Sequence, residues 1–175
     1  MAASYDVQTY LLDRANIHDT VSKLTMNIDL KSYDGLVNDV YAPRVVIDYT
    51  SMFGGNPMET TGKDWVESLK PMMSGFDSTQ HIVMNQVVDL PQPAKGVSRP
   101  DKCTVIAHVN GHMFLRTARG GPMMHNGGRY ILDLVRLPEL GQKGQNPWRI
   151  SKHATLLSWE DGSTDVMNAV TSIGH

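Results

Sequence analysis

The stretch Thr79-Gln80-His81-Ile82-Val83-Met84-Asn85 marks the point where the chain changes from helical to extended patterning. It opens a run of β-branched and apolar residues over 81–90, which is typical of a half-buried strand. Three later runs have the same character, at 103–116, 129–137 and 148–159. Loops that contain glycine or proline separate the runs, at 91–101, 117–128 and 138–147. The second half of the chain therefore predicts an antiparallel meander.

The first half of the chain is mainly helical in its patterning. Apolar residues recur every three or four positions over 10–30, which predicts an amphipathic helix, and shorter helices are expected over 33–40 and 62–73. Between them, 45–49 predicts a strand and 52–61 a loop. Helices on one side of a mostly antiparallel sheet define an α+β fold. We expect a curved sheet that wraps around the N-terminal helices as a cone-shaped barrel with an open end.

Length and composition indicate one domain, over 1–175, with a core at about 10–160 and a C-terminal tail at 161–175. The formal net charge is −2, so no excess of positive charge draws the chain to nucleic acid or to an anionic membrane. No stretch approaches the roughly 20 apolar residues that span a bilayer. Cys103 is the only cysteine and 1–13 lacks the apolar core of a signal peptide, which together predict a cytoplasmic protein.

Three side chains with acid–base chemistry stand at the ends of the predicted elements. Asp29 lies near the end of the first long helix, Tyr49 ends the first strand, and His81 begins the second. A carboxylate, a phenol and an imidazole that meet at one pocket mouth can move protons without a metal or an organic cofactor. Each residue also has a structural interpretation: an ion pair, a tyrosine packed at the sheet edge, and a histidine bonded to a backbone carbonyl.

A pair of histidines, His108 and His112, suggests a metal site because residues four apart on a strand share a face. The apolar residues that alternate with them, from Ala107 to Leu115, are expected to face the inside of the cone. His108, Asn110 and His112 then lie on the outer face. We therefore predict no bound metal.

The glycine-rich stretch 120–128 is not followed by the Lys-Ser/Thr pair of a phosphate-binding loop. We expect it to belong to the loop 117–128, where His125 is either solvated or closes over the pocket mouth as a lid. The sequence also lacks the motifs of serine hydrolases, zinc proteases and dinucleotide-binding proteins.

Three short segments together resemble the scytalone dehydratase-like, SnoaL-like branch of the nuclear-transport-factor-two-like superfamily. They are Ile47-Asp48-Tyr49, Thr79-Gln80-His81 and Trp148-Arg149-Ile150, and the resemblance covers about 17–159. It implies a cone-shaped α+β barrel with an internal pocket, no cofactor, and a homo-oligomer. We expect a dimer, with the outer face of the sheet packed against a second copy.

The resemblance also implies roles for three residues. His81 matches the catalytic histidine of the family, Asp29 its pocket carboxylate, and Tyr49 a tyrosine that polarises a substrate carbonyl. The family's second histidine falls on Leu115, and the tyrosine that precedes its aspartate is Ile28 here. These departures imply a substrate other than scytalone, and a less polar one. We expect the substrate to contact Trp65, Met84, Val109, Met113, Leu115 and Tyr130.

The resulting hypothesis is a cofactor-independent lyase or isomerase of secondary metabolism that acts on a carbonyl-containing small molecule, which we expect to be apolar and polycyclic. It would remove a proton next to the carbonyl, and water loss or rearrangement would follow. Two alternatives stay open: a polyketide or terpenoid cyclase that uses the same pocket, and a non-catalytic binding or docking module. The sequence leaves the identity of the substrate open.

Overall fold

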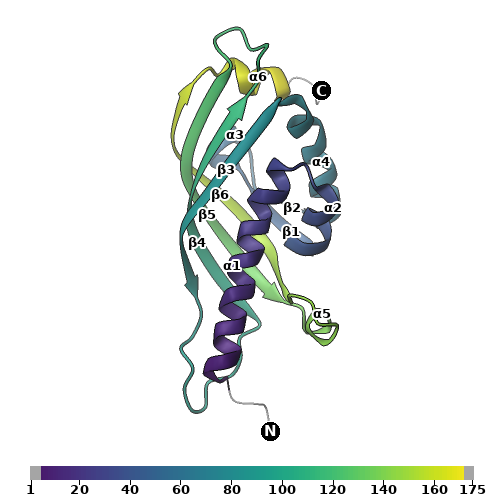
Figure 1. Cartoon of the computed structure of the whole chain (residues 1–175), viewed down its shortest axis with the longest axis vertical. Coiled ribbons are helices and arrows are strands. Elements are labelled where there is room, and N and C mark those ends of the chain that lie inside the picture. The colour runs from purple at the N-terminus through teal and green to yellow at the C-terminus, as the bar shows by residue number, and fades with distance from the viewer. Residues whose placement is uncertain (1–4, 172–175) are drawn as a thin grey trace.

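A curved sheet of six strands wraps around the long N-terminal helix in the computed structural model, which describes residues 5–171 (Figure 1). The strands are β1 (Tyr41–Asp48), β2 (Met58–Thr61), β3 (Ser78–Asp89), β4 (Lys102–Phe114), β5 (Met123–Arg136) and β6 (Trp148–Gly162). The helices are α1 (Val7–Asp29), α2 (Tyr33–Gly35), the π-helical turn η1 (Leu36–Val40), α3 (Thr50–Phe53), α4 (Gly62–Gly75), α5 (Pro138–Gln142) and α6 (Asp165–Thr171).

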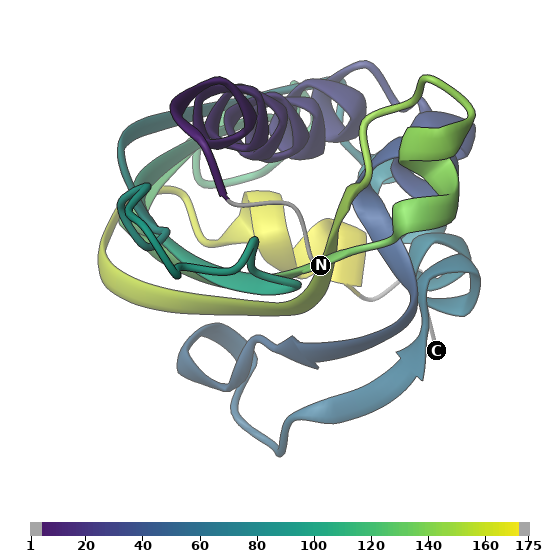
Figure 2. The same ribbon diagram turned by 90° about the horizontal axis from the view of Figure 1, so that it is seen from below.

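The predicted α+β architecture is confirmed. Strands β3 to β6 form the expected antiparallel meander, and the strand order is β2-β1-β6-β5-β4-β3. β1 pairs with β6 in parallel and with β2 antiparallel, so the sheet is mixed. Seen from below, the sheet curves beneath α1 (Figure 2). It does not close on itself, because β2 and β3 remain its two edges.

Helix α1 supplies the largest helical contribution to the core. It begins where the Asp6 side chain accepts a hydrogen bond from the backbone N–H of Thr9 at 2.7 Å, which satisfies one free donor of the first turn. One face of the helix is buried against the sheet, through Ile17, Val21, Leu24 and Ile28. No helix in the described part of the chain is long and apolar enough to cross a membrane.

Two predicted boundaries in the first half of the chain are wrong. β1 begins at Tyr41, so Pro43 lies inside a strand. The pairing of β1 with β6 shifts register between Tyr41 and Val46, and this irregularity accommodates a residue without an N–H. The segment 52–61, expected as a loop, contains β2, a short, partly exposed edge strand whose polar sequence gives little extended signal.

The segment 117–128 is also only partly a loop, because β5 already begins at Met123. The glycines of this segment predict a loop, but Gly127 and Gly128 are required for the packing of β5 against β6. The Trp159 ring covers Gly127, where an added Cβ would lie 2.4 Å from it. An added Cβ on Gly128 would lie 2.0 Å from the backbone oxygen of Leu156. The register of β5 against β6 shifts between these two glycines, so a β-bulge explains both.

This correction places His125 on the outer face of the sheet, and not in a loop where it would be solvated or close over the pocket mouth. It pairs with His112 across β4 and β5, and the two Nδ1 atoms are 2.6 Å apart. His108, Asn110 and His112 alternate with buried residues and lie on the outer face, as expected. His108 instead contacts Asn85, at 3.0 Å. The two histidines of the suspected metal pair therefore have different partners.

The C-terminal segment packs onto the domain. β6 continues to Gly162, and α6 places Val166 and Val170 in the hydrophobic core. The part of the expected tail up to Val170 is therefore part of the folded domain, while 172–175 lie outside the described residues.

An ion pair between the buried Asp13 and the partly exposed Arg99 stabilises the narrow end of the cone. Asp13 is fully buried on α1 and accepts hydrogen bonds from Arg99 Nε at 2.9 Å and Nη2 at 2.6 Å. It also accepts one from the indole N–H of Trp148 at 2.8 Å. A buried carboxylate needs such partners, because an unpaired charge in the core is strongly destabilising. These contacts join the loop after β3 and the start of β6 to α1.

A second buried polar group, His153 on β6, is uncharged. Its ring is completely buried, its Nδ1 is 2.9 Å from the Tyr41 hydroxyl, and its Nε2 is 3.4 Å from the Tyr49 hydroxyl. Burial, together with the nearby charge of His81, lowers the pKa of His153 to about 3. The ring is therefore neutral at physiological pH.

The β-bulge predicts a strong effect of Gly128→Ala. The new Cβ would meet a backbone oxygen that cannot move without breaking the sheet, and we expect the free energy of unfolding to fall by about 3 kcal/mol. Gly141→Ala is the matched control, because its Cβ would meet only Pro147 at 3.8 Å, and it should be neutral or slightly stabilising. Thermal unfolding of the two variants tests this, and equal melting temperatures would contradict it.

His153 predicts a pH dependence of stability. The unfolded chain takes up a proton on this ring near its ordinary pKa of about 6.5, whereas the folded protein does so only near about 3. Stability is therefore lost as the pH falls below about 6.5. Between pH 7 and 5, wild type should lose about 2 kcal/mol more than His153→Asn. Urea unfolding at both pH values measures this, and parallel losses would refute it.

Candidate active site

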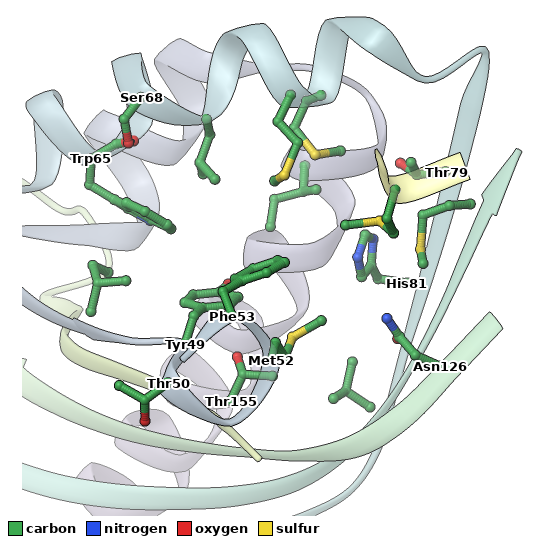
Figure 3. Close-up of a pocket in the computed structure, with 18 of the residues that line it drawn as sticks. Tyr49, Thr50, Met52, Phe53, Trp65, Ser68, Thr79, His81, Asn126 and Thr155 are labelled. Atoms are coloured by element: carbon green, nitrogen blue, oxygen red, sulfur yellow. The ribbon is translucent and has the colours of Figure 1, made fainter. Parts of the chain in front are cut away.

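A cavity of about 460 Å³ lies between the concave face of the sheet, α3 and α4 (Figure 3). Its wall is mainly apolar, and it contains six of the eleven methionines of the chain. They are Met52, Met58, Met72, Met73, Met113 and Met167. Methionine side chains adapt to irregular shapes and contact apolar ligands well. The described residues that line the cavity include neither lysine nor arginine, so the wall suits an uncharged ligand.

The structure joins Asp29 and His81 into a hydrogen-bonded pair at this cavity. Asp29 is the last residue of α1, and its Oδ1 accepts from His81 Nδ1 at 2.7 Å. Its two oxygens also accept from the backbone N–H of His81 at 2.7 Å and from the Thr79 hydroxyl at 2.8 Å. A carboxylate can only accept, so Nδ1 carries the proton. In the neutral ring, Nε2 is then the free base.

The contacts of Asp29 also keep it ionised. Burial disfavours the charged carboxylate, but the hydrogen bonds from His81 and Thr79 outweigh burial, and the pKa of Asp29 lies below its ordinary value. Its position at the C-terminus of α1 is unfavourable for an anion, which these three donors offset. An ionised Asp29 can stabilise His81 when the ring takes up a second proton.

Tyr49 lies in the same cavity wall, immediately after β1. Its ring packs against Trp65 and Phe53, with centroid distances of 5.6 and 6.2 Å. Burial raises the pKa of Tyr49 to about 12. The phenol therefore keeps its proton at neutral pH and is a hydrogen-bond donor. Asp29, Tyr49 and His81 thus meet around one cavity, although Asp29 acts there through His81.

Four of the six residues expected to contact the substrate lie in the cavity wall, and their role in binding stays a prediction. They are Trp65, Val109, Met113 and Tyr130. The placement of the other two was wrong. Met84 is 37 % exposed on the outer face, because it is an odd number of residues from the inward-facing His81. Leu115 follows the end of β4 and is packed in the core outside the wall.

Asn126 and Thr155 are among the polar residues of the wall that the sequence patterns missed. Asn126 lies on β5, and its side chain covers Gly111, the residue paired with His81 (Figure 3). It would have been found if the strand had been extended through the glycines. Thr155 is only 7 % exposed, and its hydroxyl lies near the Tyr49 hydroxyl without a hydrogen bond of good geometry to any described residue. It lies at an inward position of the predicted strand 148–159, where threonine gave no functional signal.

The histidines, cysteine and carboxylates of the chain do not form a metal cluster in the described residues. Within 5–171, no three of these side chains lie close enough together to hold a metal ion. The polar side chains of the cavity wall are one imidazole with its carboxylate, two phenols, two amides, four aliphatic hydroxyls and one indole, and the imidazole–carboxylate pair suits acid–base chemistry.

The comparisons with known proteins agree with this fold. A solved protein from Kribbella flavida, Kfla4162, superposes with a TM-score of 0.73 at 26% identity, over 89% of this chain and 95% of that one. A provisionally named scytalone dehydratase from Novosphingobium aromaticivorans has a TM-score of 0.69 at 16% identity, over 90% and 92%. Hexachlorocyclohexane dehydrochlorinase LinA-type3 from Novosphingobium barchaimii has a TM-score of 0.66 at 14% identity, over 89% and 92%.

The search among curated proteins found no match. The family comparison is the informative one, because the model of the SnoaL-like domain matches residues 9–154. That range contains Asp29, Tyr49, His81 and strands β1 to β5, whereas Thr155 and Met167 of the cavity wall lie beyond it. The protein therefore belongs to the SnoaL-like domain family.

Proposed function

We propose that the protein is a cofactor-independent lyase or isomerase that removes a proton next to the carbonyl group of an apolar, uncharged small molecule. The observation that carries this proposal is the Asp29–His81 pair, with its Nδ1–Oδ1 distance of 2.7 Å, at the wall of a cavity of about 460 Å³. An imidazole backed by a carboxylate is a suitable general base near neutral pH.

The reaction begins when His81 Nε2 takes the proton from the carbon next to the carbonyl. The electrons of that C–H bond move toward the carbonyl oxygen, and the Tyr49 hydroxyl stabilises the developing enolate by donating a hydrogen bond. Asp29 stabilises the imidazolium that forms. The imidazolium then returns the proton, either to a leaving hydroxyl, which departs as water, or to another carbon, which gives an isomer.

The cavity wall supports the substrate class. Its methionines and the aromatic rings of Phe53 and Trp65 favour an apolar, ring-containing molecule, and the described residues of the wall include no lysine or arginine that would bind an anionic group. The family and two of the fold neighbours agree with an elimination, since a dehydratase and a dehydrochlorinase both remove a proton and a leaving group. A place in secondary metabolism is part of the same proposal.

Proton removal can be tested without the natural substrate. In D₂O the wild-type protein should catalyse deuterium exchange next to the carbonyl of fused-ring ketones such as 2-tetralone. His81→Ala should slow this exchange about 100-fold or more, because the general base is lost. Mass spectrometry of the ketone measures the exchange. His108→Ala, on the outer face, is the matched control and should exchange at the wild-type rate, as should wild type treated with a metal chelator.

Asp29→Asn should also slow the exchange strongly, because an amide cannot stabilise the imidazolium. The double variant should be little slower than His81→Ala alone, since the two residues act as one unit. Asp48→Asn is the matched control, because the Asp48 carboxylate binds the Thr50 hydroxyl at 2.7 Å and is not part of the pair. A His81→Ala variant that exchanges at the wild-type rate would refute the proposal.

The expected homo-oligomer stays a prediction, and the outer face of the sheet is where it is expected. This face exposes five large apolar side chains near His108 and Asn110: Ile82, Met84, Val87, Ile106 and Trp159. Exposed apolar patches of this kind mark interaction sites. Helix α1 covers the opposite, concave face, so it leaves this patch open (Figure 1).

A charge placed in this patch should break the assembly. We expect light scattering to report a mass above that of the 19.4 kDa monomer for wild type and the monomer mass for Ile106→Asp. Leu11→Asp is the matched control, because Leu11 is 57 % exposed on α1, away from the sheet face. It should leave the mass unchanged. A wild-type monomer at micromolar concentration would contradict the prediction.

A further inference from the structure

Three buried groups form a chain that ends at the cavity. The Tyr41 hydroxyl is 2.9 Å from His153 Nδ1, and His153 Nε2 is 3.4 Å from the Tyr49 hydroxyl. Tyr41 is 2 % exposed and His153 is fully buried, so neither exchanges its contact for water. The proton-transfer scheme above uses only the last member, Tyr49. The other two have no role in it.

The hydrogen-bonding capacity of Tyr41 fixes the tautomer of His153. A buried hydroxyl needs an acceptor for its proton, and Nδ1 of His153 is the acceptor that Tyr41 contacts among the described residues. The indole N–H of Trp65 also lies near this hydroxyl, but it can only donate. Nδ1 therefore accepts from Tyr41, and the single proton of the neutral ring is on Nε2.

This tautomer controls the direction of the Tyr49 hydroxyl. The Nε2–H group of His153 points to the Tyr49 oxygen and occupies one of its lone pairs. The proton of Tyr49 is then free to be donated into the cavity. The opposite tautomer would draw that proton toward Nε2 and leave Tyr49 as an acceptor, which cannot stabilise an enolate.

Thr155 lies beside Tyr49 in the same wall. It follows His153 by two positions on β6, so both side chains point to the concave face. Its hydroxyl is buried and forms no hydrogen bond of good geometry within residues 5–171, although the Tyr49 hydroxyl lies near enough to interact with it. A buried hydroxyl without a partner is costly, and a ligand oxygen in the cavity would satisfy it.

We propose that Tyr49 and Thr155 form a two-donor subsite for one oxygen atom of the ligand, a carbonyl or enolate oxygen, and that His153 is the positioning residue that directs the Tyr49 proton into it. The inference rests on the proposed function, to which it adds a second donor and the residue that orients the first. In Figure 3, Tyr49 and Thr155 lie apart from His81 and Asn126. The ligand therefore places its oxygen toward β6 and its acidic C–H group toward His81.

The test uses 2-tetralone labelled with ¹³C at its carbonyl, because the resonance of that carbon moves downfield when its oxygen accepts hydrogen bonds. Wild type should move the bound resonance downfield of its value in a non-polar solvent. Tyr49→Phe and Thr155→Val should each remove part of this shift and weaken binding about tenfold. Running the same series in His81→Ala keeps the readout independent of proton transfer.

Two conservative variants of His153 separate positioning from structure. His153→Gln keeps an N–H near the position of Nε2 and should retain most of the wild-type shift. His153→Asn keeps only an acceptor for Tyr41 near the position of Nδ1 and should lose as much of the shift as Tyr49→Phe. Asparagine is one methylene smaller than glutamine, so a merely structural role would lower the melting temperature of His153→Asn and weaken binding without changing the resonance of the bound carbonyl.

Two results would overturn the inference. One is a bound carbonyl whose resonance is the same in wild type, Tyr49→Phe and Thr155→Val. The other is a His153→Asn protein with the wild-type shift. Thermal unfolding shows whether His153→Asn folds. If it does not, the Tyr49→Phe, Thr155→Val double variant decides instead. Two donors to one oxygen must be coupled, so losses of the carbonyl shift that simply add in the double variant would overturn the inference. If wild type shifts the resonance of the bound carbonyl but catalyses no deuterium exchange, the proton-transfer scheme is refuted and the two-donor subsite is not.

Discussion

The rest of the structure depends on the hydrogen bonds that the Asp29 carboxylate accepts from Thr79 and His81. Asp29 ends α1 and accepts three hydrogen bonds from the start of β3, at 2.7 to 2.8 Å. These bonds attach the long helix to an edge strand of an open sheet and, at the same time, fix the tautomer and direction of His81. The ionised oxygens of Asp29 therefore have two roles. They hold α1 against β3 at the wide end of the cone, and they orient His81 as a general base.

Much of the fold could be predicted from the sequence because its signals are local. The period of α1 and the alternation along β4 follow directly from the side chains that each element buries, and Asp29, Tyr49 and His81 stand at element ends that the same periods define. The missed features depend on distant partners. The start of β5 was hidden by Gly127 and Gly128, whose lack of side chains is explained only by β6. The role of His153 depends on Tyr41, 112 residues earlier.

The two histidines of the concave face show how surroundings divide one residue type into two chemistries. His81 is paired with an ionised carboxylate and borders the cavity, so its positive form is stabilised when it takes up a proton. His153 contacts the hydroxyls of Tyr41 and Tyr49 and the Tyr130 ring and stays neutral, because burial and the nearby charge of His81 lower its pKa to about 3. The first can exchange protons with a ligand, whereas the second can only hold one in place.

The buried Asp13–Arg99 pair has a consequence for how this domain can change. Asp13 and Asp29 are 16 positions apart on the same helix, which corresponds to about 24 Å at a rise of about 1.5 Å per residue. The Asp13–Arg99 ion pair therefore stabilises the narrow end of the cone at a distance from the methionine-lined cavity. Substitutions that reshape the cavity leave that ion pair intact, so the domain can acquire new ligands by single replacements while the opposite end retains its hold on the chain.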